Sequence, residues 1–105
     1  MVINILGTLY SISELAREED KELSDCNGYC DHTTKNIVIV RKPDDSTLGN
    51  WEVYRKKLLR HEIIHAFLFE SGLHENFDWH DETVVDWIAA LFPKMQMAFG
   101  EAGCL

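Results

Sequence analysis

One stretch of this sequence, residues 51–72, restricts the possible folds more than any other. Its apolar side chains recur at steps of three and four, which is the repeat of a helix that buries one face. They are Trp51, Tyr54, Leu58, Leu59, Ile63, Phe67 and Leu68, and Gly72 supplies a C-terminal stop. The sequence therefore predicts one long helix whose apolar face the remaining elements must cover.

The length and charge of the chain exclude several classes of protein. Its 105 residues suffice for a single domain, residues 1–105. Ten Lys and Arg against eighteen Asp and Glu give a net charge of −8, which excludes a general affinity for nucleic acid. No apolar stretch approaches the ~20 residues of a membrane span, and no basic segment of a secretory signal is visible. Three cysteines, an odd number, indicate reduced thiols (Cys26, Cys30 and Cys104). We expect a cytoplasmic protein with neither nucleic acid nor membrane as a partner.

Strands are predicted in the first 40 residues. Residues 2–12 carry β-branched and aromatic side chains around Gly7, which predicts a strand with a bulge or a strand that enters a helix. The charged residues 13–25 predict a short surface helix. Residues 37–40, four β-branched residues in a row, give the strongest strand signal, and residues 28–31 are the expected hairpin partner.

A second helix is predicted after the polar segment 74–81. Asp81 and Glu82 suit a helix N-terminus, and Pro93 is expected to break or bend the helix. The tail, residues 94–105, predicts a last short helix. The expected fold class is therefore α+β, with a small antiparallel β-hairpin or sheet packed on the long helix and on a second, glutamate-bearing helix.

The long helix contains the sequence His61-Glu62-Ile63-Ile64-His65, an HExxH motif. Residues four apart lie about 40° from each other around a helix, so both imidazoles project from one face and can fill two corners of a tetrahedral Zn²⁺ site. Glu62 lies beside the open position, where it can act as general base on a water. Because the surrounding residues are apolar, burying these three groups without partners would cost several kcal/mol.

A zinc site of this type needs a third protein ligand. Leu68 and Ser71 stand where the metzincin extension requires Gly and His, so that subclass is excluded. Glu82 can complete a His₂Glu site, and Asp86, four residues later, can orient a ligand imidazole. The rival third ligands are His74, Asp78, His80 and Asp81.

HExxH followed by Glu82 and Asp86 resembles the gluzincin metallopeptidases. The small size and the hairpin before the helix also resemble minimal gluzincins and the ImmA/IrrE-type metallopeptidases of bacteria and mobile elements, over about residues 37–90. The resemblance implies that His61, His65 and Glu82 bind Zn²⁺ and that Glu62 is the catalytic base. It also implies that Asp86 is the partner of His61 and that a strand before the helix holds an extended peptide.

These features predict a zinc-dependent metalloendopeptidase that hydrolyses a protein or peptide substrate. By resemblance alone, that substrate is a regulatory protein of a phage or mobile element. The alternatives are a zinc-stabilised binding or regulatory module without turnover, and a SprT-like protease with a third His ligand. The sequence does not indicate an oligomeric state.

Further candidates surround the motif. His80, Tyr54 and Tyr29 are candidate donors to the transition state. Cys26, Cys30 and His32 form a fragment of a second metal site but lack a fourth ligand, so free thiols are favoured. Four of the ten basic residues are expected on the solvated outer face of the long helix, namely Arg55, Lys56, Lys57 and Arg60.

Overall fold

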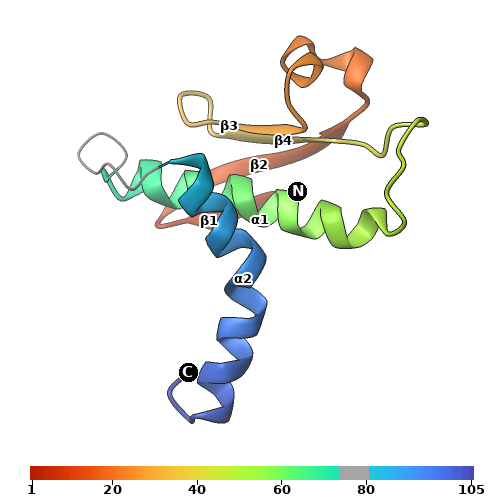
Figure 1. The fold of residues 1–105 in the computed structure, drawn as a ribbon. Helices are drawn as coiled ribbons and strands as arrows, with labels where there is room; N and C mark the ends of the chain where they lie inside the picture. The colour runs from red at the N-terminus through yellow and green to blue at the C-terminus, as the bar shows by residue number, and fades with distance from the viewer. Residues whose placement is uncertain (74–80) are drawn as a thin grey trace.

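The computed structural model describes residues 1–73 and 81–105 and is an α+β fold, as predicted (Figure 1). A four-stranded sheet is followed by two helices, with two short 3-10 turns between the second and third strands. The strands are β1 (Val2–Ile5), β2 (Thr8–Leu15), β3 (Gly28–Asp31) and β4 (Asn36–Val40). The helices are α1 (Trp51–Glu70) and α2 (Glu82–Glu101).

The first fifteen residues form a hairpin rather than the single strand predicted for residues 2–12. Ile5 pairs with Thr8, so Leu6 and Gly7 are the whole turn. Both have positive φ, 50° and 93°, as the tight turn that matches strand twist requires. The helix predicted for residues 13–25 is also wrong, because β2 continues to Leu15 and the two 3-10 turns follow it.

The sheet has the order β1-β2-β4-β3 and is mixed. The β1–β2 and β3–β4 pairs are antiparallel, which confirms the predicted hairpin of residues 28–31 with 37–40. The β2–β4 pair is parallel, which the sequence did not predict. As a consequence β4, the strand before the helix, is an inner strand, so the implied role of that strand in holding an extended peptide along its edge is wrong. Among the described strands, the outer one on that side is β3.

Helix α1 packs against the sheet, and its apolar face completes the core. Ile5 and Tyr10 from the first hairpin, Ile37 from β4 and Ala66 from α1 form one fully buried cluster. The helix begins where the Asn50 side chain accepts a hydrogen bond from the Val53 amide at 3.2 Å. This buried cluster joins α1 to the sheet.

Helix α2 crosses α1 and then runs away from the sheet (Figure 1). The Asp81 side chain caps it by accepting from the Val84 amide at 2.9 Å. The helix continues through Pro93 to Glu101, so the predicted break and the separate tail helix are both wrong. In the described part of the chain, neither helix is long and apolar enough to cross a membrane.

Candidate metal centre and cavity

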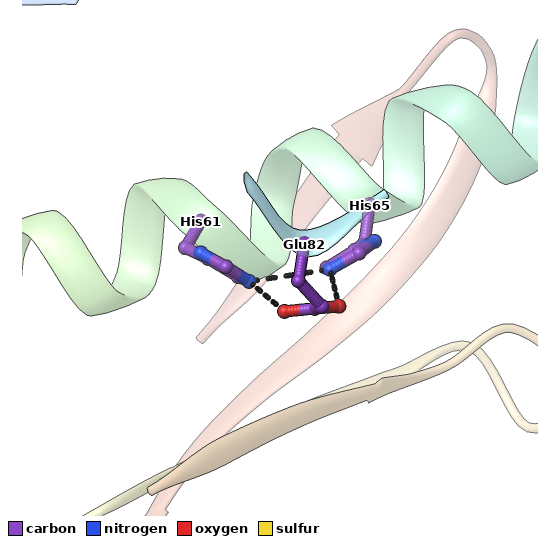
Figure 2. A group of neighbouring side chains, drawn as sticks. All are labelled: His61, His65 and Glu82. Carbon is purple, nitrogen blue, oxygen red and sulfur yellow. Dashed lines mark hydrogen bonds and ion pairs between the residues drawn. The ribbon is translucent and has the colours of Figure 1, made fainter. Parts of the chain in front are cut away.

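Three of the predicted ligands lie together where α2 begins beside α1. The Nε2 atoms of His61 and His65 are 3.2 Å apart, and each lies 2.8 Å from one oxygen of Glu82 (Figure 2). The two imidazoles come from successive turns of α1, while Glu82 is the first residue of α2. The helical repeat therefore brings the histidines together, and the packing of α2 adds the carboxylate.

Asp86 lies one turn further along α2 and fixes the orientation of His61. Its Oδ1 accepts from the Nδ1 of His61 at 3.2 Å, and its Oδ2 lies 3.3 Å from Nζ of Lys57. Partial burial opposes ionisation of Asp86, but the hydrogen bonds from His61 and Lys57 outweigh it and lower the pKa. Because a carboxylate only accepts, Nδ1 of His61 carries the hydrogen and Nε2 is left to face His65 and Glu82.

The donor set fits a zinc ion. Atoms about 2.0–2.1 Å from a tetrahedral zinc lie about 3.3 Å from each other. The separations of 2.8 to 3.2 Å among His61, His65 and Glu82 are within a few tenths of an ångström of that value. Two His and one Glu ligand would leave the fourth position of a tetrahedral ion open. Among the described residues, no other group of His, Cys, Asp and Glu side chains is arranged to hold a metal.

Glu62 is the most unusual residue of the site. Its side chain is only 5% exposed, and its carboxylate makes no hydrogen bond or ion pair with any described residue. Burial raises its pKa to about 7; the charge of His61 opposes this and that of Glu82 adds to it. A buried carboxylate without donors is costly, and such groups concentrate at functional sites.

The His/His/Glu group opens into a cavity of about 550 Å³ between α1 and β3, the outer strand on that side among the described residues. The walls carry Glu62, Tyr54 and Lys57 from α1, and Cys26 and Cys30 from the β3 side. Burial raises the pKa of Cys30 to about 12, so this thiol remains protonated at neutral pH. The second metal site that Cys26, Cys30 and His32 suggested is not formed in the described part of the chain.

Two of the candidate transition-state donors lie within the described residues. The Tyr54 hydroxyl accepts from Nδ2 of Asn27 at 2.6 Å, which leaves its own hydrogen available to the cavity. The Tyr29 hydroxyl donates to Asp20 and is occupied there. Asp81, a rival ligand, caps α2 instead. The remaining candidates lie outside the described residues, namely His74, Asp78 and His80.

The basic residues of α1 are mostly not on a solvated face. Lys56 is exposed as expected, but Arg55 pairs with Glu14 of β2 and Lys57 reaches Asp86. Arg60 donates from Nε to the carbonyl oxygen of Ala89 in α2 at 2.7 Å. Lys57 is the site residue that the sequence pattern did not single out, although its place four residues before His61 puts it on the same helix face.

Comparison with known proteins found no match for this chain among family models, curated proteins or solved structures. The resemblance to gluzincins and ImmA-type peptidases therefore stays a prediction from the motif.

Proposed function

We propose that the chain is a zinc-dependent metallopeptidase that hydrolyses a peptide bond in a protein or peptide substrate. The observation that carries this proposal is the position of Glu62. A carboxylate that is buried beside a His/His/Glu group, with no hydrogen-bond donor in residues 1–73 and 81–105, contributes nothing to stability. It is suited to receive a proton, because a base works best when its pKa lies near the operating pH.

The roles of the residues follow from their contacts. A zinc ion bound to His61, His65 and Glu82 would supply Lewis-acid chemistry, acidifying water and polarising a carbonyl. Glu62 takes the proton from the attacking water and returns it to the leaving amine nitrogen. Asp86 keeps His61 in one tautomer, and the Tyr54 hydroxyl donates to the oxygen on which negative charge develops.

The outer edge of β3 favours a peptide as the substrate. The Val40 amide donates to the Asn27 carbonyl at 2.8 Å, so the alternation of an antiparallel ladder turns the main-chain groups of Gly28 and Cys30 outward. These residues also line the cavity. An extended peptide can therefore pair with β3 and pass its backbone over Glu62. The free state of all three cysteines favours a reducing compartment, the cytoplasm.

The first test is metal content. Protein purified without a metal-affinity step is analysed by elemental mass spectrometry, for the wild type and for His65→Ala. We expect about one zinc per chain in the wild type and a loss of it in the variant. A folded wild type that holds no zinc and takes up none would contradict the proposal.

The second test is hydrolysis of a pool of unstructured peptides read by mass spectrometry. Glu62→Gln should retain zinc and lower the cleavage rate by about 10²–10⁴, the range of a general base. Glu18→Gln, an exposed glutamate on the 3-10 turn after β2, is the matched control and should cleave normally. Normal cleavage by Glu62→Gln would refute the assigned base. Zinc with no cleavage of any peptide would mark the metal as structural.

A further inference from the structure

Helix α2 contains a proline in its interior and nevertheless continues to Glu101. Pro93 has no amide hydrogen, so the carbonyl of Ala89, four residues earlier, lacks its normal helical donor. A proline ring in a helix interior also crowds the carbonyl four residues earlier. Because Ala89 is fully buried, water cannot supply the missing hydrogen bond.

Arg60 supplies the missing donor from another helix. Its Nε lies 2.7 Å from the Ala89 oxygen, a short distance for a charge-assisted hydrogen bond. Arg60 directly precedes the ligand His61 in α1. A sequence feature that usually ends a helix therefore becomes, in this chain, the point at which α2 is attached to α1.

We infer that the Arg60–Ala89 bond, which Pro93 makes possible, positions Glu82 for the metal. Glu82, Asp86 and Ala89 are at i, i+4 and i+7, so they share one face of α2. Glu82 and Asp86 meet α1 through flexible side chains, whereas Ala89 does so through its backbone. Arg60 is thus a positioning residue, and the bond fixes where α2 starts. Its effect on metal binding depends on the proposed function, whereas the bond itself does not.

The bond is tested first without metal, by urea unfolding in excess chelator. The variants are Arg60→Met, Pro93→Ala and the double variant, with Lys56→Met as the matched control because Lys56 is an exposed cation of the same helix. Arg60→Met should lower the urea midpoint, since it leaves the buried Ala89 carbonyl without a donor. The double variant should recover most of this loss, because an alanine amide at position 93 can donate to Ala89. Arg60→Lys should lose less than Arg60→Met, and Lys56→Met should not move the midpoint.

The second arm measures zinc affinity by competition with a chromophoric chelator. Arg60→Met should bind zinc about tenfold more weakly, the scale seen for residues that support metal ligands. Arg60→Lys should restore most of that affinity, and Lys56→Met should bind zinc as the wild type does. Pro93→Ala and the double variant should stay about as weak as Arg60→Met, because the Ala89 carbonyl is then satisfied within α2 and its bond to α1 is lost. If Arg60→Met does not fold, the comparison is made in the Pro93→Ala background, where Arg60→Met should have little effect on either readout.

The results test the Arg60–Ala89 bond and the proposed zinc-dependent function separately. Equal losses from Arg60→Met in the wild-type and Pro93→Ala backgrounds would overturn the bond, whatever the metal does. Recovery of both the midpoint and the zinc affinity in the double variant would overturn the positioning role, because Glu82 would then be in place without the bond from Arg60. A wild type that binds no zinc but shows the expected recovery in urea would refute the proposed function and leave the bond standing.

Discussion

Two glutamates of α1 lie in opposite environments. Glu62 is buried at the cavity and has no hydrogen-bond donor among the described residues. Glu70, at the C-terminal end of the same helix, accepts from Lys35 and Tyr10 at 2.7 Å each and from Thr8 at 3.1 Å. The pKa of Glu62 is raised to about 7 mainly by burial, while the hydrogen bonds from Lys35, Tyr10 and Thr8 lower that of Glu70 to about 2.

The difference shows that the supply of donors, and not the residue type, decides what a carboxylate does in this molecule. Glu70 ties the end of α1 to β2 and to the β3–β4 turn, which fixes the helix on the sheet. Glu62 lies about two turns earlier on that fixed helix, where no donor from the described part of the chain reaches it. One carboxylate is stabilising and inert, and the other is destabilising and basic. Their pH dependences should therefore have opposite signs.

The largest expected effect is on the Glu62 side. Its pKa is raised from 4.5 to about 7, so the folded protein holds this proton more tightly than the unfolded chain does. Stability contributed at low pH is therefore lost as pH rises from about 4.5 to about 7. In metal-free protein, the free energy of unfolding of Glu62→Gln relative to wild type should increase by about 2–3 kcal/mol between pH 5 and 8.

This comparison is made by urea unfolding of both proteins in chelator, so that the titration of the shared histidines cancels. Glu18→Gln should follow the wild type at every pH. A constant difference between Glu62→Gln and wild type across this range would show that Glu62 is not a destabilised carboxylate, and the contrast with Glu70 would disappear.

Glu70→Gln should show the reverse dependence. The depressed pKa means that the stabilisation is complete above the ordinary glutamate pKa near 4.5 and is lost as pH falls towards about 2. Glu70→Gln should therefore melt below the wild type at pH 7 and approach it as the pH falls through this window. Thermal unfolding followed by circular dichroism measures both curves. If the difference in melting temperature is just as large at pH 2, the loss comes from altered packing or hydrogen-bond geometry and not from the lost charge.

The sequence predicted the grouping of His61, His65 and Glu82 better than it predicted the sheet. Helical spacing places His61 and His65 on one face, and the apolar residues around them predict that both are buried. The sequence alone therefore brings these two imidazoles together. Glu82 and Asp86 needed the motif as well, because their contact with α1 depends on how α2 packs. The role of Glu70 could not be predicted, since its donors Tyr10 and Thr8 lie 60 and 62 residues away and only the sheet brings them to it.

Each error in the fold has an identifiable physical cause. Leu6 has a positive φ that leucine rarely adopts, so nothing but Gly7 marked the first turn. Pro93 was expected to break α2 because the donor that replaces its amide is on another helix. The inner position of β4 depends on a parallel pairing with β2, which short-range patterns do not reveal. For α2 and for β4, the deciding contact is distant in the sequence.

Among the residues that donate to Glu70, Tyr10 should have the largest effect on stability. Its ring is fully buried and its hydroxyl donates to the carboxylate at 2.7 Å, so Tyr10→Phe removes one hydrogen bond and keeps the packing. We expect a loss of about 1.5–3 kcal/mol in the free energy of unfolding at pH 7, the scale of a hydrogen bond to a charged group. Tyr54→Phe, whose hydroxyl meets Asn27 in an exposed setting, should cost less. An equal loss in both variants would show that the hydrogen bond from Tyr10 to Glu70 has no special weight.

Lys35 should have the smallest effect of the three, although its ammonium lies as close to Glu70 as the Tyr10 hydroxyl does. Its side chain is 40% exposed, so water competes for the charge, and an ion pair of this kind contributes about 0.2–1 kcal/mol. Lys35→Met keeps a long side chain at the positive φ of 60°, so the turn is not altered further. The loss in urea unfolding should shrink in 1 M salt, whereas that of Tyr10→Phe should not. If Lys35→Met loses more unfolding free energy than Tyr10→Phe and the loss does not depend on salt, Glu70 is held by a desolvated ion pair. Glu70 would then differ from Glu62 by its charged partner and not by its hydrogen-bond donors.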